Sequence, residues 1–128
     1  MARRLGSLDP KLMVLATAAE PSSIVDISPE ELWRRLHQAA APTLLDVREP
    51  WEHALARLPG SLNVPLGELG RRLSELDPEA ELIVYCHHGV RSVRAALLLA
   101  RYGYRRLANL RGGLEAYSRV DPSIPRYG

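Results

Sequence analysis

The pattern of apolar and polar positions along the chain predicts an alternation of short strands and helices. The clearest strand is 81–85, an almost continuous apolar run of the kind expected for a strand covered on both faces. Shorter apolar stretches at 43–47, 61–64 and 106–110 are also expected to be strands, and Pro65 stops the second of these. The chain therefore offers four candidate strands from sequence pattern alone.

The segments around these strands have helical features. Residues 28–31, Ser-Pro-Glu-Glu, supply an N-cap serine, a proline suited to the first helical position and a glutamate that completes a capping box. An apolar stripe with helical spacing follows them. Further helices are expected at 50–56, at 66–76, from 92 to a stop at Gly103, and at 112–118.

Strands that alternate with helices predict an α/β fold, in which a parallel sheet carries helices on both faces. The length of 128 residues suits one domain, and 46% hydrophobic residues suffice for a core. Because the chain has no Phe, Leu, Val, Ile and Ala must fill most of that core. We expect residues 24–128 to form the domain and residues 1–23 to be a partly flexible N-terminal extension.

The net charge of +2 is too small to indicate a nucleic-acid partner, but the charge is unevenly distributed. Residues 1–82 carry 9 basic and 13 acidic side chains, a net of −4, whereas residues 83–128 carry 8 and 2, a net of +6. An electropositive second part favours small anionic substrates. A solvated Arg-rich face is the alternative interpretation.

The apolar runs and the single cysteine also bear on location. No run approaches the ~20 residues of a membrane span, so no membrane partner is expected. The first residues faintly resemble a signal peptide, but Asp9 and Lys11 interrupt the short apolar part. One cysteine excludes an intramolecular disulfide, and nothing demands an oxidising compartment. We expect a cytoplasmic protein, and the sequence leaves its oligomeric state open.

That cysteine, Cys86, lies at the carboxyl end of the central predicted strand, within L-I-V-Y-C-H-H-G-V-R-S. In open α/β sheets this edge is where ligands bind. The short loop before the next helix aims successive N–H groups inward, Gly89 supplies backbone freedom, and Arg91 adds a positive charge. A thiol at the base of such a loop should ionise readily and act as a nucleophile.

Three other interpretations compete with a nucleophile. A lone cysteine is most often a small buried hydrophobic residue, although its place between a buried strand and a Gly/Arg loop reverses those odds. A zinc site is disfavoured, because Cys86, His87 and His88 are adjacent and their side chains cannot readily converge on one tetrahedral ion. The two histidines are as well explained by solvated loop residues as by a role in contacting or orienting a substrate.

Four separated motifs together carry a resemblance to a known family. They are L-L-D-V-R-E at 44–49, P-G-S-L-N-V-P at 59–65, C-H-H-G-V-R-S at 86–92 and R-G-G-L-E-A-Y at 111–117. In order and spacing, residues 24–128 resemble a single-domain rhodanese, a sulfurtransferase. The resemblance implies a five-stranded, mostly parallel sheet with helices on both faces. It also implies a cysteine that carries sulfur as a persulfide.

By this resemblance Cys86 is the catalytic nucleophile and residues 87–91 complete the active loop that binds the substrate. Asp46 and Arg48 match the D-x-R positions beside that loop and are expected to brace it, through an ion pair with Arg91. Ser92 is a further supporting residue. At 56–58 this chain has Ala-Arg-Leu where family members often have Gly-His-Ile, so the role of that histidine is not transferred. The residues of the loop after the nucleophile are His87, His88, Gly89, Val90 and Arg91.

The predicted reaction begins with attack of the Cys86 thiolate on the outer sulfur of an anionic donor, such as thiosulfate, a persulfide or a polysulfide. Because there is no second cysteine, the acceptor of the Cys86 persulfide must be external: cyanide, a thiol or a partner protein. Neither a metal nor an organic cofactor is expected.

Two other function classes stay open. One is a cysteine phosphatase or arsenate reductase on the same scaffold, but those enzymes have C-x5-R, whereas Cys86 and Arg91 are spaced as C-x4-R. A tighter ring of N–H groups suits one sulfur atom better than a tetrahedral phosphate. The other is a non-catalytic protein-binding module of the rhodanese fold, against which the intact cysteine, glycine and arginine argue.

Overall fold

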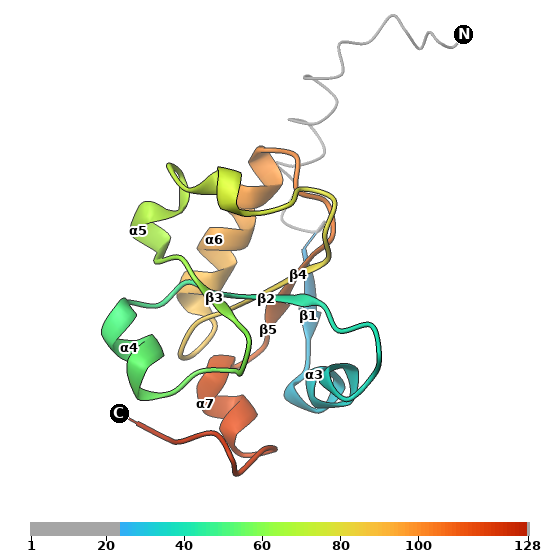
Figure 1. Ribbon diagram of the computed structural model, residues 1–128, viewed down its shortest axis with the longest axis vertical. Helices are drawn as coiled ribbons and strands as arrows, with labels where there is room; N and C mark the ends of the chain where they lie inside the picture. Colours follow the sequence, from blue (N-terminus) through green and yellow to red (C-terminus); the bar gives the residue numbers. More distant parts are fainter. Residues whose placement is uncertain (1–23, 128) are drawn as a thin grey trace, which may run out of the picture.

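The computed structural model of the chain describes residues 24–127, so the predicted N-terminal extension lies outside the described residues. Five strands form one sheet in the order β1-β5-β4-β2-β3, and every neighbouring pair is parallel (Figure 1). This confirms the predicted α/β class. The strands are β1 Val25–Ile27, β2 Thr43–Asp46, β3 Leu62–Asn63, β4 Leu82–Tyr85 and β5 Leu107–Leu110.

Helices follow the strands along the chain, and most begin where the sequence predicts. The described helices are α3 Pro29–Leu36, α4 Pro50–Leu55, α5 Leu66–Leu69, α6 Val90–Arg101 and α7 Gly113–Ser118. The longest of them, α6, has 12 residues. No helix within residues 24–127 combines the length and apolar character needed to cross a bilayer. The cytoplasmic location stays a prediction.

Two element predictions differ from the structure. The expected helix at 66–76 is wrong, because α5 ends at Leu69 and only a 3₁₀ turn, Leu73–Glu75, follows it. Gly67 and Gly70 explain the interruption, since glycine disfavours the helical backbone. The edge strand β1 was not among the four strands predicted from the pattern of apolar residues. It has only three residues and one buried side chain, too few for a recognisable periodicity.

The capping box predicted for α3 is only half formed. The Ser28 hydroxyl accepts a hydrogen bond from the Glu31 N–H at 3.1 Å. The Glu31 carboxylate, however, pairs with Arg34 on the next turn. A complete capping box occurs instead at α4, where the carboxylates of Glu49 and Glu52 each accept a backbone N–H.

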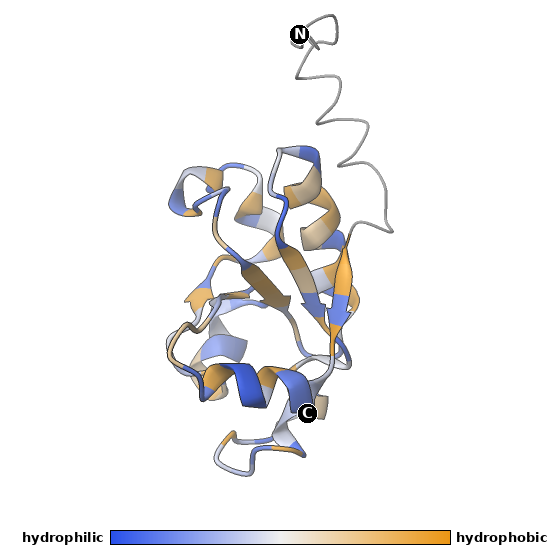
Figure 2. Cartoon of the chain, turned by 90° about the vertical axis from the view of Figure 1, so that its right-hand side faces the viewer, coloured by the Kyte–Doolittle hydropathy of each residue, from blue (hydrophilic) through white to orange (hydrophobic). Residues whose placement is uncertain are grey.

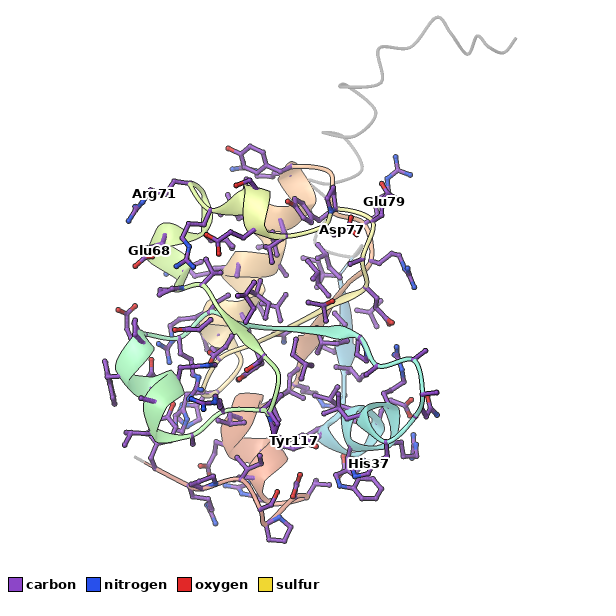
Figure 3. All side chains as sticks on the ribbon, viewed as in Figure 1. His37, Glu68, Arg71, Asp77, Glu79 and Tyr117 are labelled. Atoms are coloured by element: carbon purple, nitrogen blue, oxygen red, sulfur yellow. The ribbon has the colours of Figure 1, made fainter. Side chains whose placement is uncertain are left out.

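Apolar side chains cover both faces of the sheet, and every residue of β4 is buried. In Figure 2 the strands are coloured largely as hydrophobic. On one face α5 and α6 pack Leu69 and Leu99 against the strands. On the other face α3 and α7 contribute Leu32, Leu114 and Tyr117, and Tyr117 lies between these two helices (Figure 3). Because β4 is central and covered on both sides, its carboxyl end is held at a fixed position in the molecule.

Candidate active site

Cys86 is the residue that directly follows β4, and its side chain is only 1% exposed. The backbone N–H of Gly89 donates to Cys86 Sγ at 3.0 Å, and the N–H of Ser92 approaches it at 3.4 Å. Gly89 has φ +97°, a conformation that side chains rarely adopt, and it is the N-cap of α6. The loop therefore curls around the sulfur atom and aims N–H groups at it.

The carbonyl side of this loop is held by the start of α7. The N–H of Leu114 donates to Cys86 O at 2.8 Å, and the N–H of Glu115 donates to His87 O at 3.0 Å. This close approach requires glycine at position 113, because a Cβ there would lie 2.3 Å from His87 O. The R-G-G motif thus has a structural role in fixing the active loop.

The partner of Arg91 differs from the predicted one. Its Nη1 and Nη2 donate to Glu52 Oε1 and Oε2 at 2.6 and 2.9 Å, a bidentate pair between α6 and α4. The expected ion pair between Arg91 and the D-x-R residues is therefore wrong. Arg91 lies beside Glu52 because α4 and the first turn of α6 adjoin at this edge of the sheet.

Asp46 and Arg48 instead pair with one another, and both side chains are fully buried. Arg48 Nε and Nη2 donate to the two oxygens of Asp46 at 2.8 and 2.6 Å. Arg48 Nη2 also donates to the carbonyl oxygen of Ala56, and His53 Nδ1 lies 2.7 Å from Asp46 Oδ2. Burial alone would lower the pKa of Arg48, but its hydrogen bonds with Asp46 and the charge of Asp46 raise it.

Besides Glu52 and His53, sequence reasoning missed two residues of the site, Tyr127 and Asn109. The Tyr127 hydroxyl accepts from Arg48 Nη1 at 2.6 Å and donates to Glu52 Oε2 at 3.0 Å, so it joins the two ion pairs. The Ser92 hydroxyl donates to Asn109 Oδ1 and lies 3.4 Å from Cys86 Sγ. Neither Tyr127 nor Asn109 belongs to a motif that marks it as part of the site.

The two histidines have different environments. The His87 ring lies 4.4 Å from the Tyr127 ring and 4.2 Å from that of His88, measured between centroids. Burial and the neighbouring His88 lower the pKa of His87, and its buried Nδ1 has no partner among the described residues. His88 and Val90 are exposed. The described residues contain no cluster of three His, Cys, Asp or Glu side chains suited to a metal ion.

Replacing Glu52 by Gln should make the protein less sensitive to acid. Burial alone would raise the pKa of Glu52, but hydrogen bonds from Arg91, the Glu49 backbone and Tyr127 lower it from 4.5 to about 2. A depressed folded-state pKa adds stability that is complete above pH 4.5 and is lost as pH falls toward 2. In urea unfolding across this range, the free energy of unfolding should fall less steeply with decreasing pH for the Gln variant than for the wild type.

The matched control for this experiment is Glu30→Gln, a change at an exposed glutamate on α3. It should retain the acid sensitivity of the wild type. If the free energy of unfolding depended on pH equally in the Glu52 and Glu30 variants, the acid sensitivity would not come from the Glu52–Arg91 pair.

Comparison with known proteins agrees with the fold. The family model described as "Rhodanese-like domain" matches residues 28–119. A protein of Allochromatium vinosum named "Sulfurtransferase" is 36% identical over 94 residues, which cover 73% of this chain and 88% of that protein. The crystal structure of a rhodanese-related protein from Thermoplasma volcanium has a TM-score of 0.69 and 29% identity, covering 76% of this chain and 93% of that one.

A longer relative contains a second kind of domain. The chloroplastic "Rhodanese-like/PpiC domain-containing protein 12" of Arabidopsis thaliana is 38% identical over 124 residues. The match covers 91% of this chain but only 42% of the Arabidopsis protein. Because the family model matches most of the chain, and because the sheet and the relatives agree with it, the chain belongs to the rhodanese-like domain family.

Proposed function

We propose that this protein is a sulfurtransferase that moves sulfane sulfur from an anionic donor to a thiophilic acceptor through a persulfide on Cys86. The observation that carries the proposal is the hydrogen bond from the Gly89 N–H to the buried Cys86 Sγ. An N–H group aimed at the sulfur atom can stabilise the negative charge that the reaction places there. The relative named as a sulfurtransferase supports the same class of reaction.

In the first half-reaction the Cys86 thiolate attacks the outer sulfur of a donor such as thiosulfate. A new S–S bond forms at Sγ, the donor's own S–S bond breaks, and sulfite leaves with the electron pair. The N–H groups of Gly89 and Ser92 are fixed before the reaction and stabilise negative charge on sulfur.

In the proposed site the residues around the loop hold it in place. Arg91 is bound bidentately to Glu52, so its main role is to anchor the end of the loop while its charge adds to the local field. Asp46 and Arg48 support this anchor from the buried side, through Tyr127. Ser92 supports the sulfur atom directly.

The second half-reaction needs an acceptor from outside the chain, because Cys86 is the only cysteine. The acceptor, cyanide or a thiolate, attacks the outer sulfur of the persulfide, and Cys86 Sγ leaves as a thiolate with the electron pair. In both half-reactions one S–S bond forms and one breaks, so the transfer needs neither a metal nor an organic cofactor. A partner protein that presents a thiol would react in the same way.

A phosphatase or arsenate reductase is less favoured, because the loop is short and its carbonyl side is tied down. The hydrogen bonds from α7 to Cys86 O and His87 O oppose the widening that a tetrahedral oxyanion would require. A purely protein-binding role has no comparable need for N–H groups directed at a cysteine sulfur. Turnover of an aryl phosphate or arsenate would favour the first alternative.

Intact mass spectrometry tests the proposal directly. After incubation with thiosulfate, the protein should gain the mass of one sulfur atom, and later addition of cyanide should remove it. The same incubation of the Cys86→Ser variant should give no gain. Absence of a gain with thiosulfate, polysulfide and mercaptopyruvate alike would refute a Cys86 persulfide and favour a binding module.

A further inference from the structure

A chain of hydrogen bonds leads from Cys86 through the interior of the protein to the edge strand β1. Cys86 Sγ lies 3.4 Å from the Ser92 hydroxyl, and that hydroxyl donates to Asn109 Oδ1. Asn109 Nδ2 donates in turn to Asp26 Oδ1 at 3.2 Å. The chain joins the proposed nucleophile to side chains on α6, β5 and β1, and the proposed reaction gives no role to its last two members.

Asn109 is the polar member of an otherwise apolar strand. β5 reads Leu-Ala-Asn-Leu, and Asn109 is only 4% exposed. Asparagine is depleted in strands, and a buried amide costs free energy unless its polar atoms are paired. The register of the sheet places Asn109 opposite Asp26 on β1 and opposite Val84 on β4, two residues before Cys86 (Figure 1). The amide therefore lies between the Asp26 carboxylate and the active loop.

The direction of each hydrogen bond in this chain follows from Asp26. A carboxylate at neutral pH only accepts, so the amide turns its Nδ2 toward Asp26 and its Oδ1 toward Ser92. Because Oδ1 also only accepts, the single hydrogen of the Ser92 hydroxyl points at Asn109. The Ser92 oxygen then faces Cys86 Sγ with its lone pairs. It can accept from the thiol S–H, but it has no hydrogen to give to a thiolate.

From this geometry we infer that Asn109 is a positioning residue that withholds the Ser92 hydroxyl from the Cys86 thiolate. Asp26 holds the amide in the orientation that this requires. The inference rests on the proposed function and adds to it a control of the nucleophile. A thiolate that accepts fewer hydrogen bonds is more basic, and the intrinsic nucleophilicity of a thiolate rises with its basicity. Asn109 thereby keeps the sulfur a stronger nucleophile than it would be with the hydroxyl turned toward it.

The ultraviolet absorbance of the thiolate, followed against pH, tests this inference. Cys86 is the only cysteine, so the Cys86→Ser variant supplies the blank. In Asn109→Leu the Ser92 hydroxyl loses its acceptor and turns to the sulfur. The midpoint of the titration should then fall by about 1 pH unit, a tenfold change in the ionisation equilibrium. The rate of persulfide formation with thiosulfate, measured above the midpoint, should fall about threefold because the thiolate is less basic.

Asp26 is exposed and offers a matched pair of variants that disturb no packing. Asp26→Ala removes the acceptor, leaves the Asn109 amide free to turn, and should lower the midpoint in the same direction. Asp26→Asn removes the charge but keeps an oxygen that accepts from Asn109 Nδ2, so it should retain the wild-type midpoint. An equal fall in both variants would assign the effect to the charge of Asp26 and overturn the role of the hydrogen bond.

A double variant separates the hydroxyl from a general effect of the Asn109 change. In a Ser92→Ala protein, Asn109→Leu should leave the midpoint unchanged, because there is no hydroxyl to release. A shift that persists there, or a wild-type midpoint in Asn109→Leu alone, would overturn the inference. The other charged or titratable groups that face the loop are the same in all these variants: Arg91, Glu52, Arg48, His87, His88 and Glu115.

The titration does not depend on turnover, so the two proposals fail separately. If the wild type forms no persulfide with any donor, the proposed sulfurtransferase function has failed, while the midpoints still decide the role of Asn109. If the wild type forms the persulfide but the midpoints do not differ between it and Asn109→Leu, only the role of Asn109 is lost.

Discussion

Replacing Cys86 by serine should lower sulfur transfer by about 10³-fold or more while the protein stays folded. A serine hydroxyl is not ionised near neutral pH and cannot form the persulfide. Its oxygen is slightly smaller than sulfur and can still accept the N–H groups of Gly89 and Ser92, so the loop should persist. Thiocyanate formation from thiosulfate and cyanide measures the loss.

The structural control for this variant is its free energy of unfolding. Because Cys86 is buried within the core that α6 covers, a change of about 1 kcal/mol is expected, far less than unfolding requires. A folded serine variant that keeps more than about a tenth of the wild-type rate would show that Cys86 is not the nucleophile.

Replacing Asp46 by alanine should destabilise the protein by about 3–5 kcal/mol. Arg48 would then keep a fully buried positive charge without its carboxylate partner, and His53 would lose the same partner. Urea unfolding at neutral pH measures the change. The Arg48 side chain also binds Tyr127, which binds Glu52, the partner of Arg91 in the active loop. Movement of Arg48 in the variant should therefore also shift the active loop.

Two further variants separate the buried charge from a general effect of mutation. Glu81→Ala removes a partly exposed pair with Arg35 and should cost about 1 kcal/mol or less. The double change Asp46→Ala with Arg48→Met removes both charges and should recover part of the lost stability. If the Asp46 and Glu81 variants lost equal stability, burial of the Asp46–Arg48 pair would not be the cause.

Local sequence was enough to predict much of the fold. The continuous apolar run of β4, the helix starts at Pro29 and Pro50, and the stop near Gly103 follow from residue types within a few positions of one another. Alternation of these elements was enough to predict a parallel sheet. The predictions failed in two segments where the local pattern is weak. Glycines interrupt the helix expected at 66–76, and the three-residue β1 is too short to show a periodicity and is recognised only by its pairing with β5.

For the site, the sequence by itself determined that Cys86 lies at the carboxyl end of a buried strand, and that it begins a C-x4-R loop that contains Gly89. Only the tertiary structure decided which side chains surround this loop. Glu52 lies 39 positions from Arg91, and Tyr127 lies 79 positions from Arg48. Spacing along a chain reports periodicity over a few residues, whereas partners so distant are brought together by the packing of α4, α6 and the C-terminal segment around the sheet.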